Sequence, residues 1–307
     1  NDDVENNLIH LAEPMSSYAY ALGGEYPGTN IARAWRHLLQ NHTHDSICGA
    51  AVDRAHEDAL YNFSISKTVA EECTNKGVIS VLSHIDSLSA YKPTDHTLTL
   101  FNTLPYAREE VIELVVDTPK GASAAADIGV GGAPTMGDFY DIIDSEGSKV
   151  EYVELSQEDI SIGVERQMDT KAIKFKANRK HILVKARLPQ NGYVTYAVRM
   201  RAPELACHPE IMENRPLIAR DCGVLENKYL KVTLHPNGTF DMLDKQTGRL
   251  MEGLHYFTDT GEVGSAHISN VPKRNTVYTS LGANANITML ESNTLRGKFR
   301  VELSMML

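Results

Sequence analysis

The spacing of apolar residues changes near Pro93 and divides the chain into a helical part and a β-rich part. Before Pro93, apolar residues recur every three or four positions, which is the period of an amphipathic helix. The longest such stripe consists of Leu60, Phe63, Ala70, Cys73, Gly77, Val81, Ile85 and Leu88. It predicts one long helix that starts near Asp53 and ends before Pro93, because proline lacks the N–H that a helix needs.

Two further helices are predicted upstream of this stripe. A weaker pattern covers Leu8–Leu22 and stops at the breaker sequence GGEYPG. Thr29 or Asn30 can cap a second helix that runs to about Asn41, since a short polar side chain there satisfies free backbone N–H groups. Asp53 can cap the third helix in the same way. Residues 1–92 are therefore expected to form a three-helix bundle.

Beyond Pro93 the apolar period falls to two, as in β-strands. The expected strands are His96–Phe101, Glu109–Val116, Lys171–Lys176, Ile182–Leu188 and Tyr193–Met200. A hairpin is expected where Tyr229–Leu234 and Thr239–Leu243 flank an Asn-Gly pair, which tolerates the positive φ of a tight turn. Because strands follow helices instead of alternating with them, we predict an α+β multidomain fold. Its expected domains are the helical residues 1–92, a β-sandwich over residues 93–220, and the start of a C-terminal β-sandwich over residues 221–307.

Composition and charge narrow the classes of function. The 307 residues leave room for two or three domains, and the formal net charge of −10 argues against nucleic acid as a partner. No apolar run approaches the roughly 20 residues that span a bilayer, and no signal peptide opens the sequence. The four cysteines form no CxxC pair, which indicates reduced thiols in a cytoplasmic protein and disfavours a cysteine-based zinc site. The missing initiator Met and the apolar ending VELSMML lead us to expect that the natural protein extends beyond both ends.

Candidate chemistry is concentrated in the segment WRHLLQNHTHDSICG, which contains His42, His44 and Asp45. On a continuous helix, residues two positions apart do not face each other. The two histidines can therefore bind one metal only if the helix has already ended. The simpler interpretation is that both interact with free carbonyl groups at a helix C-terminus. Cys48 is expected to be a small buried residue at a tight packing point and not a nucleophile.

The remaining polar residues are weaker candidates. His56 is interpreted as a solvated or packed helix residue, and the later histidines show no ligand spacing. Asp138, Asp141 and Asp144 flank a Gly-rich stretch, but they lack the regular spacing and distal Glu of a calcium loop. We expect these three to be solvated turn carboxylates.

Four stretches resemble glycoside hydrolase family 38, the α-mannosidases. WRHLLQNHTHDSICGAAVDRAHED is similar to the signature of the family's helical domain, where bacterial and cytosolic members carry a stretch much like NHPHDSICG. FNTLP, beginning at Phe101, resembles the β motif that follows the helices. The segment Leu225–Gly253 resembles the family's ENEYLRV…DG…LYDKETGR, and ESNTL, beginning at Glu291, a weaker ExGPL.

The resemblance implies a role for two residues of this chain. His44 matches the one zinc ligand that the helical domain supplies, and Asp45 matches the neighbouring Asp that contacts sugar hydroxyls. His42 falls outside the matching core, so it is expected to be structural or to lie behind the ligands. The nucleophile, the acid/base and three further zinc ligands belong to an N-terminal α/β domain that has no counterpart here, so no catalytic residue is assigned. The implied partner is a mannose-containing oligosaccharide. A homo-oligomer is compatible with the resemblance, and no membrane partner is expected.

One departure from the family leaves an alternative open. The family's GDxGDxY is replaced by the segment Gly261–His267, GEVGSAH. Together with the missing N-terminal domain, this motivates a second hypothesis, in which the chain is a non-catalytic carbohydrate-binding or assembly module. The first hypothesis is the middle and C-terminal part of a zinc-dependent, retaining α-mannosidase, whose isolated fragment is inactive.

Overall fold

The computed structural model describes residues 1–119, 140–164, 173–200, 216–220, 223–265 and 268–305. It divides into two compact units. The first comprises residues 1–109, 143–148 and 187–198, and the second comprises residues 110–142, 149–186 and 199–307. The predicted Gly-rich stretch 121–137 and Asp138 lie outside the described residues.

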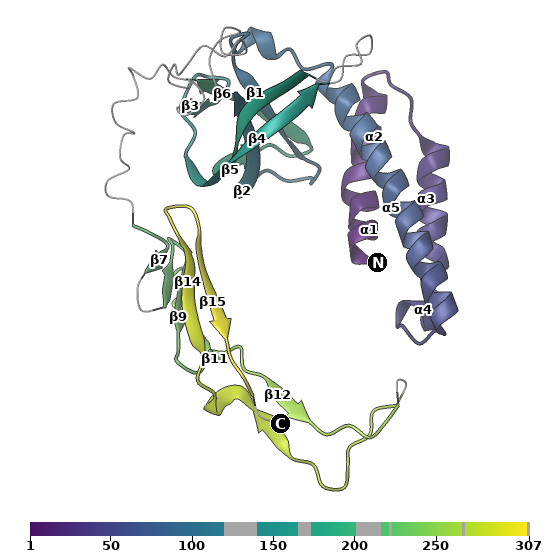
Figure 1. The fold of residues 1–307 in the computed structure, drawn as a ribbon, viewed down its shortest axis with the longest axis vertical. Coiled ribbons are helices and arrows are strands. Elements are labelled where there is room, and N and C mark those ends of the chain that lie inside the picture. Colours follow the sequence, from purple (N-terminus) through teal and green to yellow (C-terminus); the bar gives the residue numbers. More distant parts are fainter. Residues whose placement is uncertain (120–139, 165–172, 201–215, 221–222, 266–267, 306–307) are drawn as a thin grey trace. The chain divides into compact units, whose positions relative to one another are not determined.

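The helical part of the first unit follows the apolar stripes of the sequence. Its elements are α1 (Asp2–Asn7), a π-helical turn η1 (Leu8–Ala12), α2 (Glu13–Ala21), α3 (Gly28–Gln40), α4 (His44–Ile47) and α5 (Asp53–Leu82), with a 3₁₀ turn η2 (Ser87–Ser89) after them. Figure 1 shows α2, α3 and α5 side by side, and α2 and α3 both pack on α5. The expectation of three simple helices is therefore incomplete. The first predicted helix is interrupted by the π turn η1 just before Pro14, because the proline nitrogen has no hydrogen to donate to a carbonyl oxygen one turn earlier. The single turn α4 was not predicted.

The predicted helix ends need correction. Neither Thr29 nor Asn30 caps α3, which begins at Gly28 after Pro27, and Asp53 is the first residue of α5, not its cap. The predicted long helix stops at Leu82, so Ile85 and Leu88 lie outside it, and Leu88 is 66% exposed.

A cluster of buried residues from α1, η1, α3 and α5 forms the helical core: Val4, Leu8, Ala12, Ile31, Ala34, Leu38, Ala70 and Cys73. Gly77 lets α5 approach α2 closely, because a Cβ there would lie 2.8 Å from the Met15 backbone.

The β part contains only antiparallel pairs among the strand registers described. The first sheet has the order β1 (His96–Asn102), β6 (Gly192–Met200), β3 (Tyr140–Ile143), and the second has the order β2 (Arg108–Pro119), β5 (Ile173–Leu188), β4 (Tyr152–Val164). Strands β1 and β6 pair from His96↔Val198 to Asn102↔Gly192. The two strands predicted between Lys171 and Leu188 are one continuous strand, β5, which pairs with β4 from Ile173 to Val184.

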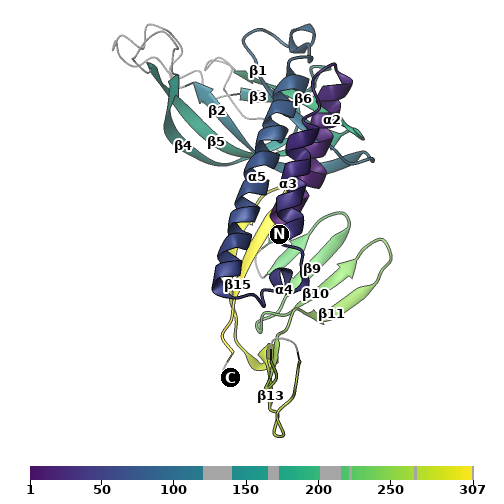
Figure 2. The same cartoon turned by 90° about the vertical axis from the view of Figure 1, so that its right-hand side faces the viewer.

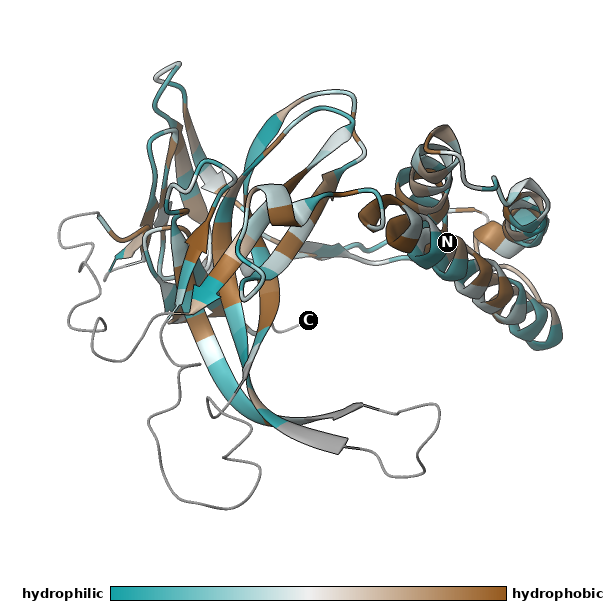
Figure 3. Ribbon diagram, turned by 90° about the horizontal axis from the view of Figure 1, so that it is seen from above, coloured by the Kyte–Doolittle hydropathy of each residue, from teal (hydrophilic) through white to brown (hydrophobic). Residues whose placement is uncertain are grey.

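The second unit also contains a five-stranded sheet and two hairpins. The sheet has the order β11 (Leu250–Leu254), β10 (Phe240–Asp244), β9 (Leu230–Leu234), β8 (Val224–Glu226), β7 (Ala219–Arg220). The predicted hairpin is confirmed, with Phe240 opposite Leu234 and Gly238 at φ +85°. Strands β12 (Thr258–Thr260) and β13 (Val277–Thr279) form one hairpin, η6 (Ser280–Gly282) follows, and β14 (Asn286–Ser292) pairs with β15 (Gly297–Glu302). Hydrophilic and hydrophobic positions alternate along the strands in Figure 3.

Candidate functional site

The candidate site is the turn between α3 and α5, residues 42–52, and the backbone there is not one continuous helix. Helix α3 ends at Gln40, and Thr43 is extended, at φ −61° and ψ 143°. His44 then opens α4, a single turn that contacts α5 and is labelled in Figure 2. The condition for both histidines to share one surface, that the helix has ended, is therefore met.

A buried amide network holds the upstream end of this turn. The Asn41 side chain is 3% exposed, and its Nδ2 donates to the Ala59 carbonyl oxygen of α5 at 2.9 Å. Asn62 Nδ2 donates to Asn41 Oδ1 at 3.3 Å, and Asn62 Oδ1 lies 3.0 Å from His37 Nδ1. Sequence reasoning missed this network, because its members lie on two helices whose pairing is not visible in the spacing.

His44 and Asp45 lie together at the surface. His44 Nε2 is 3.3 Å from Asp45 Oδ1, and their side chains are 93% and 61% exposed. Neither side chain is held by packing, since α4 contains no buried residue. The arrangement presents one imidazole and one carboxylate to whatever approaches this turn.

His42 has a different environment from His44. Its Nε2 lies 2.6 Å from Asn1 Oδ1, so the ring joins the turn to the first residue of the described chain. The histidines thus do not converge on one point.

Cys48 is exposed, contrary to the prediction of a buried packing residue. Its Sγ donates a weak hydrogen bond to the Asp45 carbonyl oxygen at 3.5 Å. Because Cys48 lies at the end of a short surface turn, it makes no core contact. Its small size alone was not enough to predict burial. Leu39, near the end of α3, is also 54% exposed.

The side chains at this turn can supply part of the ligand set of a metal site. A structural or catalytic zinc takes four ligands, commonly imidazole nitrogen and carboxylate oxygen. Within the described ranges, no three His, Cys, Asp or Glu side chains group as a metal site would require. His44, with its freely accessible imidazole, fits one position of a ligand set whose other members would come from elsewhere.

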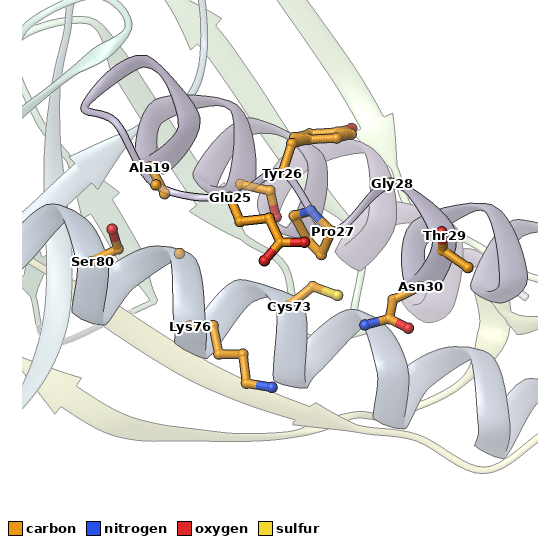
Figure 4. A pocket seen from close by; sticks show the side chains of 13 residues that line it. Ala19, Glu25, Tyr26, Pro27, Gly28, Thr29, Asn30, Cys73, Lys76 and Ser80 are labelled. Atoms are coloured by element: carbon orange, nitrogen blue, oxygen red, sulfur yellow. The ribbon is translucent and has the colours of Figure 1, made fainter.

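A separate hollow lies between the α2–α3 connection and α5 (Figure 4). Its volume is ≈ 340 Å³, and its wall includes Glu25, Tyr26, Asn30, Cys73 and Lys76. Burial raises the pKa of the Cys73 thiol, so this cysteine is a poor nucleophile. The hollow shares no residue with the His44 turn.

The downstream motifs have structural contacts. Asn102, in FNTLP, is fully buried and donates to the carbonyl oxygens of Tyr106 and Pro189 at 2.8 and 2.7 Å. Glu291, in ESNTL, forms an ion pair with Arg296 at 2.8 Å. These motifs therefore fix strands and turns.

Of the flagged aspartates, Asp141 lies within β3 and pairs with Lys149 at 3.7 Å, contrary to the prediction of a solvated turn residue. Asp144 accepts from the backbone N–H groups of Glu146 and Ser148, as expected for a turn carboxylate. In the altered segment Gly261–His267, Glu262 accepts from the Ser269 hydroxyl and from the backbone N–H groups of Gly264 and Asn270, each at 2.6 Å. These hydrogen bonds, with that of Ser269 the largest, lower the pKa of Glu262.

Comparison with known proteins shows that this turn lies within the part of the chain that matches a known domain family. Residues 1–78 match the family described as the α-mannosidase middle domain. A putative mannosylglycerate hydrolase of Halalkalibacterium halodurans is 24% identical over 96% of this chain, which covers 32% of that protein. Alpha-mannosidase 2C1 of Mus musculus is 31% identical over 42% of this chain, which covers 12% of the mouse protein. The chain thus spans about a third or less of the curated relatives it matches.

Two solved structures share the fold. An α-mannosidase from Enterococcus faecalis V583 superposes with a TM-score of 0.79 at 24% identity, over 98% of this chain and 33% of that one. A protein in glycosyl hydrolase family 38 from Enterococcus faecalis gives the same TM-score at 25% identity, over 99% of this chain and 35% of that one. No helix in the described part of the chain combines the length and apolar character needed to cross a membrane. The chain thus shares the fold of glycoside hydrolase family 38 structures, and its residues 1–78 match the α-mannosidase middle domain.

Proposed function

We propose that this chain contributes one face of an active site that hydrolyses α-linked mannosides. The observation that carries the proposal is the exposed His44–Asp45 pair, which lies within the residues that match the α-mannosidase middle domain. A histidine left 93% exposed beside a carboxylate, on a turn whose upstream end is fixed, is available to a ligand from outside this domain.

Within this proposal, His44 holds a zinc ion through its imidazole and Asp45 accepts hydrogen bonds from mannose hydroxyls. A neutral imidazole is a good zinc ligand. When bound, zinc would favour a distorted sugar ring by holding its hydroxyls, which is positioning and electrostatic chemistry and not water activation. His42 serves the turn itself through its contact with Asn1.

The bond cleavage is proposed to proceed with retention. Retaining glycosidases use a carboxylate nucleophile and a second carboxyl group as acid/base, roughly 5 Å apart. Neither is assigned in this chain, and we propose that both come from the part of the relatives that this chain does not match. The 307 residues alone are expected to show no hydrolysis.

The substrate class is proposed from the relatives. The Halalkalibacterium protein named for mannosylglycerate aligns with nearly the whole chain, whereas α-mannosidase 2C1 aligns with less than half of it. An α-mannoside with an acidic aglycone is therefore a candidate beside neutral mannosides. The β domains, over residues 93–220 and 221–307, are proposed to support the site, and the cytoplasm is the proposed location.

The test is hydrolysis of an aryl α-mannoside and of mannosylglycerate by a longer protein that contains this chain and the remaining domain. His44→Ala should lower kcat/KM by at least ~10²-fold, a loss of about 2.7 kcal/mol in transition-state stabilisation, and the remaining activity should no longer respond to added zinc. His42→Ala is the matched control, two residues away, and should retain most of the activity. Equal activity of wild type and His44→Ala would overturn the proposal. No activity in either protein would favour the non-catalytic module.

A further inference from the structure

We propose that Asn41 is a positioning residue that fixes the His44–Asp45 turn to α5. This inference deepens the proposed function and rests on it for its consequence, but its structural content can be tested without activity. Asn41 is the first residue after α3, three positions before His44.

The contacts of Asn41 tie the end of one helix to the side of another. Its Nδ2 donates to the Ala59 carbonyl oxygen at 2.9 Å, while its Oδ1 accepts from Asn62 Nδ2 at 3.3 Å. The backbone N–H of Asn41 still bonds to the Leu38 carbonyl oxygen at 3.0 Å, so the residue also terminates α3. With 3% of its surface exposed, Asn41 has little access to water as an alternative partner.

The turn itself has no buried anchor, because the His42 contact with Asn1 is made at the surface. None of the residues of α4 is buried, and the His44 side chain is almost fully exposed. The position of its backbone therefore depends on where the two flanking helices hold the ends of the turn. At the downstream end, Val52 precedes α5 without a side-chain cap and is 74% exposed. The upstream end, at Asn41, is the better fixed of the two.

The chemistry of the contact requires an amide. One planar group must offer a donor to Ala59 and an acceptor to Asn62, which an ionised carboxylate cannot do. Alanine would leave the Asn62 amide and the Ala59 carbonyl without these partners. A protonated carboxyl group, by contrast, matches the amide in shape and in its donor and acceptor.

The first measurement is amide hydrogen exchange by NMR on the full chain. Four amides of the turn bond to carbonyl oxygens of α4 or of Thr43: Ile47 to Thr43, Cys48 to His44, Gly49 to Ser46 and Ala50 to Asp45. Asn41→Ala is expected to speed exchange of these amides at least ~10-fold relative to amides in the centre of α5, because local opening becomes easier.

Ser66→Ala is the matched control. Ser66 is also fully buried and joins the same two helices, with its Oγ donating to the Ala34 carbonyl oxygen at 2.9 Å. Its loss should leave the ratio of turn to α5 exchange unchanged. Equal loosening of the turn in both variants would mean that Asn41 acts only on general stability, and would overturn the inference.

Asn41→Asp separates positioning from mere packing. At low pH the protonated Asp can donate to Ala59 and accept from Asn62, so turn exchange should match wild type after correction for intrinsic rates. As the buried carboxyl ionises, it repels the Ala59 carbonyl, and turn exchange should rise ~10-fold or more. His37, the titratable group in the network, is present in wild type as well, so wild type reports its contribution. Turn exchange in Asn41→Asp that does not change with pH relative to wild type would refute the positioning role. This variant also tests the role if Asn41→Ala fails to fold.

Failure of the proposed function is distinguishable from failure of this inference. If the turn loosens as expected but His44→Ala remains fully active in the longer protein, the positioning role stands and the catalytic role of the turn falls. If His44 proves essential but turn exchange ignores Asn41, only the positioning role is wrong.

Discussion

At the scale of single residues, Ser16 carries an unusual hydroxyl group. It lies on α2 at 1% exposure, and its Oγ has no hydrogen-bond partner. Its neighbour Ser17 is exposed and donates to the Glu13 carbonyl oxygen at 2.8 Å. A buried polar group without a partner destabilises the folded state, whereas a paired one contributes to it.

We predict that Ser16→Ala raises the free energy of unfolding by about 1 kcal/mol, because it removes an unpaired polar atom and alanine favours the helix. Urea unfolding followed by circular dichroism measures this. Ser66→Ala, which removes an equally buried but paired hydroxyl, should instead lower it by about 1 kcal/mol. A loss of stability in both variants would show that the Ser16 hydroxyl is satisfied in solution.

The residue-level outcome shows what periodicity can and cannot predict. It correctly places Ala70, Cys73, Gly77 and Val81 in the core, since they share one helix face. It fails at Leu60, which is 54% exposed, because a stripe does not reveal how wide a surface its neighbours cover. The motif singled out His44 as a zinc ligand and Asp45 as a contact to sugar hydroxyls, and both roles stay predictions.

At the scale of elements, the strand β5 explains why one prediction was wrong. The polar residues Asn178, Arg179 and Lys180 lie between the two strands that the sequence predicts. In the structure Lys180 is buried and pairs with Glu154 at 3.1 Å, while Arg179 binds Asp117 at 2.8 Å. Partners on β4 and β2 make a polar strand interior tolerable. Such partners are distant in sequence, so local pattern alone could not predict a continuous strand.

The turn between β9 and β10 gives an element-scale prediction. Gly238 has φ +85°, and an added Cβ would lie 2.9 Å from Leu303 Cδ2 and 3.2 Å from Val301 Cγ1. Gly238→Ala is therefore expected to lower the free energy of unfolding by about 1–3 kcal/mol, from backbone strain and crowding together.

Gly248 is the matched control for this turn. It has φ +73° but open space around an added Cβ, so Gly248→Ala should cost about 1 kcal/mol from backbone strain alone. Chemical denaturation of both variants gives the comparison. Equal losses would mean that the side chains of Leu303 and Val301 move aside freely.

At the scale of the whole molecule, carboxylates with lowered pKa gather in the second unit. The hydrogen bond from Arg179 lowers the pKa of Asp117, and the hydrogen bond from Lys245 lowers that of Glu226. The same direction holds for the second-unit carboxylates Asp241, Asp244, Glu262 and Glu291. Among the described carboxylates of the first unit, Asp3 shows this lowering, through Lys67. The helical core rests mainly on apolar contacts.

This asymmetry predicts that acid unfolds the second unit first. A carboxylate whose pKa is lower in the folded state stabilises that state above its unfolded pKa, and this contribution disappears as pH falls through the folded pKa. The ordinary values are 3.8 for Asp and 4.5 for Glu, so the loss should begin near pH 4.5 and continue below 3.8. Resolved NMR signals from β9 and β10 should then vanish at a higher pH than those from α3 and α5. Because these ion pairs are partly exposed, 1 M salt should weaken them at neutral pH and reduce the difference in acid stability between the two units. Earlier loss of the helical signals would show that the carboxylate pairs do not control acid stability.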